Sequence, residues 1–314
     1  MTAVLAEMTE ASTMLGWRVE LEITGRCQLQ CVHCYVDSGP SGDHGTMTPA
    51  DWHAIISETS TLGVTRLQFI GGEPTMHPAF PQLLGHAVGT GLRVEVFSNL
   101  VHIRDGWWPL LKLPNVSLAT SYYSERDDEH AAVTGSANSH HQTRANIGRA
   151  VSWGIPIRVG VIDTGDGRRV ARARADLIRL GVPADRIKVD SVREVGRASR
   201  LRPDVSQLCG HCGRGKLAVG PTGEVWPCVL SRWMKIGNVH TASLAEIVGS
   251  PEWRAAVATI PVARRGGDCV PDTGDSNDCS PAAARLDACN PDDGTCNPSS
   301  DGNDCSPAET DADY

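Results

Sequence analysis

The sequence predicts an α/β fold whose parallel sheet is either open or forms a partial barrel. The chain has 314 residues and 40% hydrophobic content, enough for a sizeable buried core. Six strand-like segments alternate with helix-like segments along it. Such alternation implies parallel strands joined by right-handed crossovers. In folds of this kind the functional site lies at the carboxyl ends of the strands.

The first strand and the first helix carry clear signals. Residues 18–24 alternate apolar and polar side chains, as a strand does. The helix over 48–63 begins at the cap-like Thr48, has Pro49 in its first turn and ends at Gly63. Further strands are expected at 66–70, 93–99, 115–123, 157–162 and 186–192, and further helices at 79–91, 107–112, 142–154 and 168–181.

Composition restricts the class of protein. The net charge of −8 argues against an obligate nucleic-acid binder, because such binding needs clustered cations. Residues 1–17 lack the basic start and apolar run of a signal peptide, and no stretch approaches the length of a membrane span. We therefore expect a cytoplasmic protein that binds neither membrane nor nucleic acid. In a reducing cytosol its eleven cysteines favour metal or cluster ligation over disulfides.

Three of these cysteines follow the first strand closely. Cys27, Cys31 and Cys34 form a C-x3-C-x2-C pattern at the functional end of the predicted sheet. Three thiolates can bind zinc with a fourth ligand, or bind three irons of a [4Fe–4S] cluster and leave the fourth iron open. Buried free thiols are a further alternative.

A second motif follows the second strand. It consists of Gly71, Gly72, Glu73 and Pro74. The glycines permit close approach of the backbone to a ligand, and a carboxylate can hold an ammonium group. Alone, such a turn is a weak signal, but its position beside the cysteine loop strengthens it.

With both motifs in this order, the chain resembles the radical S-adenosylmethionine (SAM) superfamily over roughly residues 17–198. The resemblance implies a partial (β/α)6 barrel in which the three cysteines hold a [4Fe–4S] cluster and SAM chelates its open iron. It also implies reductive cleavage of SAM to a 5′-deoxyadenosyl radical, with electrons from a reductase or a flavodoxin- or ferredoxin-type donor. By position, the resemblance assigns the methionyl amino group to the Gly71–Pro74 turn, the adenine to the neighbourhood of Tyr35, and the ribose and carboxylate to Ser98, Asn99 and Ser121.

A further cysteine pattern follows the predicted barrel. Cys209, Cys212 and Cys228 flank a segment with a turn glycine at Gly223. This spacing resembles the auxiliary iron–sulfur region called SPASM, or its shorter relative called twitch, in which a β-hairpin presents cysteines to another [4Fe–4S] cluster. Cys269 is the nearest candidate for a fourth ligand. The alternative is a zinc ribbon.

The last part of the chain differs in composition. Residues 266–314 contain twelve acids and one arginine, a net charge of −11. Each cysteine there is followed two residues later by proline, and Asn-Asp-Cys-Ser-Pro-Ala occurs twice. The segment either folds around a second auxiliary cluster, or is a flexible acidic arm, or is a fused peptide that serves as substrate. The candidate ligands of that second cluster are Cys279, Cys289, Cys296 and Cys305.

We therefore expect four parts, at residues 1–16, 17–198, 199–269 and 270–314. The resemblance implies a peptide maturase that crosslinks, epimerises or oxidises a ribosomally synthesised peptide. One alternative is the same chemistry on a small molecule, such as an aminocyclitol or a sugar. Another is a non-catalytic metal-binding partner protein. Among other residues, His130, His140 and His141 lie after the fourth strand, either in a polar loop or in a segment that approaches the site.

Overall fold

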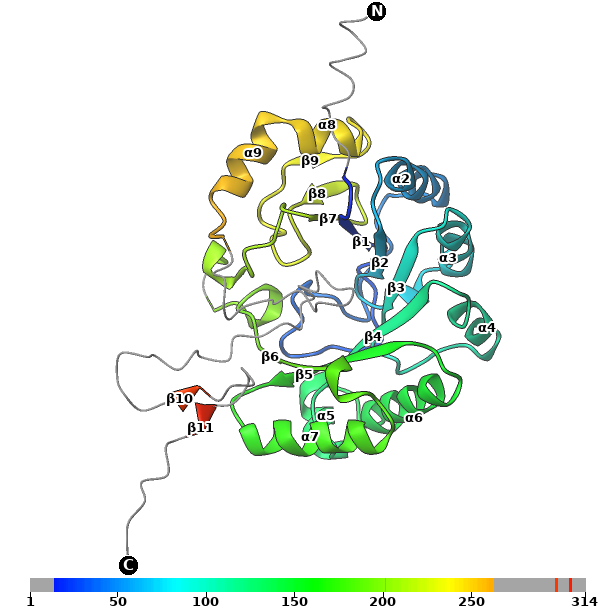
Figure 1. Ribbon diagram of the computed structural model, residues 1–314, viewed down its shortest axis with the longest axis vertical. Helices are drawn as coiled ribbons and strands as arrows, with labels where there is room; N and C mark the ends of the chain where they lie inside the picture. Colours follow the sequence, from blue (N-terminus) through cyan, green and yellow to red (C-terminus); the bar gives the residue numbers. More distant parts are fainter. Residues whose placement is uncertain (1–13, 201, 263–296, 299–304, 307–314) are drawn as a thin grey trace, which may run out of the picture.

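The computed structural model describes residues 14–200, 202–262, 297–298 and 305–306 (Figure 1). Six parallel strands lie side by side in chain order, which confirms the predicted α/β fold. Within the described residues the sheet does not close, as expected of a partial barrel. The strands are β1 (Arg18–Glu22), β2 (Arg66–Ile70), β3 (Arg93–Phe97), β4 (Val116–Tyr122), β5 (Ile157–Asp163) and β6 (Ile187–Ser191).

Helices follow the strands and cover the outer face of the curved sheet (Figure 1). Five lie where the sequence predicts them, namely α2 (Pro49–Thr61), α3 (Phe80–Gly89), α4 (Trp108–Leu111), α6 (Ser139–Ser152) and α7 (Gly167–Arg179). Helix α5 (Asp127–Thr134) was not predicted. Short 3-10 turns lie at Pro74–Met76, Asp105–Trp107, Ala184–Arg186, Gly196–Ala198 and Val205–Gln207.

The start of α2 explains why the sequence predicted a helix beginning at Thr48. The Thr48 hydroxyl accepts a 3.2 Å hydrogen bond from the Asp51 N–H, and the Asp51 carboxylate accepts a 2.8 Å bond from the Thr48 N–H. This reciprocal capping box satisfies two N–H groups that the first turn leaves unpaired. Pro49 follows at the first helical position, where its missing N–H has no cost.

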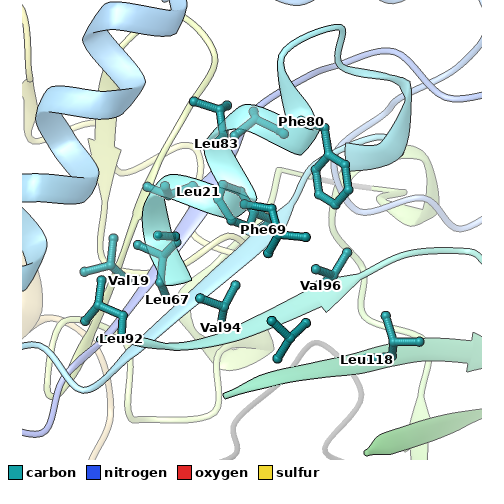
Figure 2. Close-up of a cluster of buried hydrophobic side chains, with 14 of the residues drawn as sticks. Val19, Leu21, Leu67, Phe69, Phe80, Leu83, Leu92, Val94, Val96 and Leu118 are labelled. Carbon is teal, nitrogen blue, oxygen red and sulfur yellow. The ribbon is translucent and has the colours of Figure 1, made fainter. Parts of the chain in front are cut away.

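Strand alternation separates an apolar outer face from a polar inner face. Outward residues pack with those of α3 in one continuous core, among them Val19, Leu21, Leu67, Phe69, Phe80, Leu83, Val94, Val96 and Leu118 (Figure 2). The inward positions of the same strands carry charge. Arg158 donates to both carboxylate oxygens of Glu95 at 2.7 and 2.8 Å. The barrel interior is therefore held by hydrogen-bonded ion pairs, as buried charges require.

The region after the barrel contains the predicted hairpin and joins the same sheet. Strands β7 (Lys216–Val219) and β8 (Glu224–Trp226) are antiparallel, and Gly223 in their turn has a φ of 83°, which favours glycine. Strand β7 also pairs in parallel with β1, so the sheet order is β6-β5-β4-β3-β2-β1-β7-β8-β9. The remaining elements are β9 (Gly237–Asn238), α8 (Leu244–Gly249) and α9 (Pro251–Ala258). The predicted domain boundaries stay a prediction, and one sheet spans the boundary at residue 198.

Two short strands are described near the end of the chain. Strands β10 (Asn297–Pro298) and β11 (Cys305–Ser306) pair in antiparallel fashion. The predicted ligands Cys269, Cys279, Cys289 and Cys296 lie outside the described residues. Among the helices that the structure describes, none combines the length and apolar character that a membrane crossing needs.

Candidate functional site

A pocket lies at the carboxyl ends of the barrel strands, where the fold class places function. Its volume, including space that is open to solvent, is about 980 Å³. Eight of the predicted site residues line it, namely Cys27, Cys31, Cys34, Tyr35, Gly71, Gly72, Asn99 and Ser121. The structure therefore brings the two motifs and the loops after β3 and β4 to one cavity.

The cysteine loop is fixed by hydrogen bonds from its own backbone and from Arg197. Cys27 N–H donates to the Gly39 carbonyl at 3.0 Å. Arg197, near the end of the barrel domain, donates through Nε to the Cys31 carbonyl at 2.8 Å and through its own N–H to the Cys34 carbonyl at 2.9 Å. These bonds fix the loop path by its carbonyls and leave the sulfurs free to face the pocket.

The environment of Cys27 fits a ligated thiolate. Its Sγ accepts from the Leu29 N–H at 3.4 Å and from the Asn99 side-chain amide at 3.6 Å. Burial, and then the nearby Glu73 carboxylate, raise the pKa of the Cys27 thiol to about 12, and burial raises that of Cys31 to about 11. A bound metal ion would instead lower the pKa of these thiols, because metal ligation deprotonates a thiol. Among the described residues, no three His, Cys, Asp or Glu side chains are grouped so as to hold a single metal ion.

The glycines of the second motif are required by close packing. A Cβ on Gly71 would lie 2.4 Å from the Thr24 carbonyl oxygen, and one on Gly72 would lie 2.3 Å from that of Arg26. Gly72 N–H also donates to the Thr24 carbonyl at 2.7 Å. The loops after β1 and β2 therefore approach each other so closely that no side chain fits at Gly71 or Gly72. Residues of both loops line the pocket.

Three of the residues predicted to bind SAM lie outside the pocket lining. Glu73 is fully buried, and its carboxylate accepts hydrogen bonds from Thr75 and from the Asn99 N–H. Burial raises the pKa of Glu73, although these hydrogen bonds oppose the effect. Pro74 and Ser98 are buried beside it, and Ser98 Oγ accepts from the Leu100 N–H at 3.0 Å.

The lining also contains residues that the sequence did not single out as site residues. Tyr123 stacks edge-on with His33 at 5.2 Å and lies 5.1 Å from the ring of His130. His130 is buried on α5 and is not part of a polar loop. A signal for that helix was present, because three acids stand in its first turn and Gly135 ends it with a φ of 72°. The other unpredicted lining residues include Phe97, Thr134, Thr143, Ser191, Arg193 and Leu230.

A second cysteine set lies at the open end of the β7–β8 hairpin. Cys209 and Cys212 precede β7 and Cys228 follows β8, so the antiparallel pairing brings them together. Cys212 and Cys228 are buried, with their sulfurs 2.7 Å apart. A hydrogen bond with Cys212, opposed by burial and aided by Lys216, lowers the pKa of Cys209 to about 5. Hydrogen bonds with Cys209 and Cys228, and then burial, raise the pKa of Cys212, so the negative charge is held on Cys209.

Lys216 supplies the positive charge of this second set. It is buried on the inner face of β7, with its Nζ 3.8 Å from Oε1 of Glu20. Burial alone would lower its pKa, but the Cys209 thiolate and the Glu20 carboxylate raise it. The positive charge of Lys216 stabilises the Cys209 thiolate, and it would stabilise an anionic group bound there.

Comparisons with known proteins agree with this arrangement. Residues 21–170 match the family model of the radical SAM superfamily, and residues 209–279 match that of an iron–sulfur cluster-binding domain, SPASM. PqqA peptide cyclase of Bradyrhizobium diazoefficiens is 28% identical over 199 residues, covering 60% of this chain and 51% of the relative. The subtilosin biosynthesis protein AlbA of Bacillus subtilis is 24% identical over 267 residues, covering 73% and 59%.

The chain thus spans between half and three fifths of the length of these two relatives. Among solved structures, Streptococcus suis SuiB bound to precursor peptide SuiA superposes with a TM-score of 0.68 at 12% identity. That match covers 81% of this chain and 69% of SuiB. At this identity the likeness establishes the fold.

Proposed function

We propose that this chain, whose residues 21–170 and 209–279 match the radical SAM and SPASM family models, is a radical SAM enzyme that modifies a ribosomally synthesised peptide. The two domains imply SAM and iron–sulfur clusters as cofactors. The observation that carries the proposal is that Cys27, Cys31 and Cys34 line the same pocket as Gly71 and Gly72.

In this proposal the three cysteines hold a [4Fe–4S] cluster through three irons and leave the fourth open to SAM. Reduced and loaded, this centre supplies a 5′-deoxyadenosyl radical, and the protein positions the substrate and excludes side reactions. The backbone of Gly71 and Gly72 takes the methionyl amino group, while Tyr35, Asn99 and Ser121 border the rest of SAM. Glu73 belongs to the same turn, and it also supports the Asn99 loop through its hydrogen bond to the Asn99 N–H.

The hairpin cysteines hold an auxiliary [4Fe–4S] cluster. Two observations support this assignment. The sulfurs of Cys212 and Cys228 are 2.7 Å apart, and the charge of Lys216 interacts with Cys209. An auxiliary cluster accepts the electron that a product radical gives up, which makes the net reaction an oxidation. A second auxiliary cluster on the tail cysteines and a flavodoxin- or ferredoxin-type electron donor complete the proposal.

The names of the relatives support a peptide substrate. One is a cyclase of the peptide PqqA, one belongs to subtilosin biosynthesis, and SuiB was crystallised with its precursor peptide. Reactions that fit this chain are crosslinking, epimerisation or oxidation of a peptide side chain or α-carbon.

The test uses the anaerobically prepared protein with SAM, a strong reductant and the short peptide encoded next to its gene. We expect 5′-deoxyadenosine and methionine, with deuterium transferred to 5′-deoxyadenosine from a peptide labelled at the reacting carbon. A protein that binds iron but makes no 5′-deoxyadenosine would favour the non-catalytic metal-binding alternative. Cleavage of SAM without any deuterium transfer would count against the peptide.

A further inference from the structure

One histidine of the pocket lining is not used by the cofactor assignment. His130, on α5, is 1% exposed, and it lines the pocket together with Cys31, Thr134 and Thr143. It is therefore a buried titratable group in the wall of the pocket.

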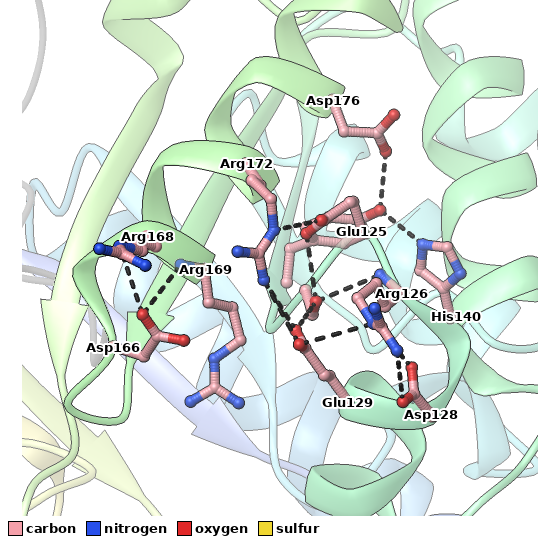
Figure 3. A network of polar contacts seen from close by, with 12 residues as sticks. Glu125, Arg126, Asp128, Glu129, His140, Asp166, Arg168, Arg169, Arg172 and Asp176 are labelled. Carbon is pink, nitrogen blue, oxygen red and sulfur yellow. Dashed lines mark hydrogen bonds and ion pairs between the residues drawn. The ribbon is translucent and has the colours of Figure 1, made fainter.

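Helix α5 is fixed by polar contacts, so this imidazole is held in place. Arg172 of α7 donates through Nε to Glu125 at 2.5 Å and contacts Glu129 on the first turn of α5 (Figure 3). Ser124 donates a hydrogen bond to the same Glu129 carboxylate. Gly135 closes the helix with its N–H on the Ala131 carbonyl at 2.9 Å.

Hydrogen bonding sets the tautomer of His130. Its Nδ1 lies 3.0 Å from Ser139 Oγ, and that hydroxyl lies 2.8 Å from the Ser136 carbonyl oxygen and 2.6 Å from Thr134 Oγ1. A carbonyl can only accept, and Ser139 has a single proton. All three contacts are satisfied when Ser139 donates to the carbonyl and accepts from both Thr134 and Nδ1, an arrangement that places the ring proton on Nδ1. Nε2 is left with its lone pair.

This Nε2 atom is buried and, within the described part of the chain, has no hydrogen-bond partner. Burial, and then the neighbouring His140, lower the pKa of His130 to about 4 against the opposing effect of Asp127, so the ring is neutral near pH 7. Tyr122, the last residue of β4, and the following Tyr123 also face the ring. The Tyr122 hydroxyl is taken by His140 at 2.7 Å and Asp176 at 2.8 Å, so it does not compete for Nε2.

The proposed reaction releases a proton in this pocket. Hydrogen abstraction turns a peptide C–H into a carbon radical. When that carbon bonds to an atom X that carried hydrogen, or when an alcohol radical becomes a carbonyl, one electron and one proton leave. The auxiliary cluster that Cys209, Cys212 and Cys228 would hold would supply the acceptor for the electron, and the proton needs a base.

We propose that His130 is the general base of this step, with Nε2 as the atom that accepts the proton and Ser139 as the residue that positions the ring. The inference rests on the proposed function and deepens it, because it restricts the reaction to crosslinking or oxidation. Epimerisation returns a hydrogen atom to carbon and releases no proton.

The discriminating variant is His130→Asn. Its amide nitrogen can still donate to Ser139 near the Nδ1 position, but it has no counterpart of Nε2. We expect 5′-deoxyadenosine formation to stay within about twofold of wild type. Modified peptide should fall about 10²- to 10⁴-fold, the usual contribution of acid–base catalysis. His141→Asn, at an exposed histidine on α6, is the matched control and should change neither product.

Two further measurements keep the test decisive if His130→Asn folds poorly. Imidazole added to His130→Ala should restore modified peptide in proportion to the neutral imidazole present, which a structural role would not produce. NMR of ¹⁵N-histidine-labelled protein should show one Nδ1–H tautomer that His130→Asn removes.

Three results would overturn the assignment. They are an Nε2–H tautomer, an unchanged yield of modified peptide, or an equal loss of both products with no rescue by imidazole. If wild type itself makes no 5′-deoxyadenosine, the proposed function has failed, and the NMR tautomer still tests the geometry.

Discussion

The backbone N–H of Asn99 donates a 2.8 Å hydrogen bond to Oε2 of Glu73. The other carboxylate oxygen accepts from the N–H and the hydroxyl of Thr75, at 3.1 and 2.7 Å. A buried carboxylate thus ties the loop after β2 to the loop after β3, and Asn99 reaches the pocket from this support.

Changing Glu73 to Gln should spare the iron but weaken SAM binding. One acceptor oxygen becomes an NH2 group that faces an N–H donor, so a charge-assisted hydrogen bond worth about 1.5–3 kcal/mol is lost. Equilibrium SAM binding and iron content measure the two effects. Thr75→Val, which removes only the hydroxyl donor, should show a smaller loss. Unchanged SAM affinity in Glu73→Gln would remove the support role.

Changing Cys27, Cys31 and Cys34 together to Ala should remove one [4Fe–4S] cluster and all 5′-deoxyadenosine formation. The auxiliary iron should remain, because the hairpin cysteines form a separate set. Iron and sulfide analysis with electron paramagnetic resonance checks this. The matched variant, Cys209, Cys212 and Cys228 changed to Ala, should lose the other cluster. SAM cleavage that persists in the first variant would refute the ligand assignment.

Lys216→Met should lower the reduction potential of the auxiliary cluster. A buried cation favours the reduced, more negative cluster, so its removal makes reduction less favourable. Each loss of about 1.4 kcal/mol corresponds to a shift of about 60 mV for one electron. Potentiometric titration measures it. Lys235→Met, at an exposed lysine paired with Glu224, is the control and should shift the potential far less.

His77 should make the protein less stable in mild acid. Its buried Nδ1 accepts from the Ala79 N–H at 3.2 Å, and burial lowers the pKa of His77 to about 4. The unfolded chain, with a pKa of about 6.5, takes up the proton first as pH falls. Native stability is therefore present above about pH 6.5 and is lost as pH falls towards 4.

Between pH 7.5 and 5.5 this loss amounts to about 1.3 kcal/mol. His77→Asn keeps a side-chain acceptor for the Ala79 N–H and does not titrate, so this part of the pH dependence should disappear. Urea denaturation of both proteins across that window gives the difference. Parallel curves for the two proteins would show that His77 titrates normally.

Truncation after Cys269 tests the acidic tail. If Cys279, Cys289, Cys296 and Cys305 hold a second auxiliary cluster, iron should fall by about one cluster and turnover of the peptide should stop, while SAM cleavage survives. If the tail is an arm, iron should be unchanged, and limited proteolysis should remove it from the intact protein. Unchanged iron would end our preference for ligation.

Local signals predicted much of this fold and site. The capping residues of α2, the alternation in the strands and the spacing of Cys27, Cys31 and Cys34 all depend on neighbours within a few residues. Helix α5 was missed because its core-facing residues include His130 and Thr134, which read as polar in a sequence. Whether these side chains are buried depends on the segments that pack against α5, and those segments are distant in the sequence.

Non-local pairing was harder to predict. The placement of β7 beside β1 depends on hydrogen bonds between segments almost two hundred residues apart, for which the sequence carries no signal. The hydrogen bond between Glu73 and Asn99 was not predicted for a similar reason. It joins loops that follow two different strands, and only the folded arrangement reveals it.

The pairing of β1 with both β2 and β7 has a consequence for biosynthesis. At translation rates of about 5–20 residues per second, β1 leaves the ribosome roughly 10–40 s before β7 is made. Throughout that interval the edge of β1 that will pair with β7 lacks its native neighbour. Open strand edges recruit other chains. The nascent protein therefore passes through an aggregation-prone stage that ends only when the hairpin arrives, and yield should improve with holdase chaperones or slower synthesis at low temperature.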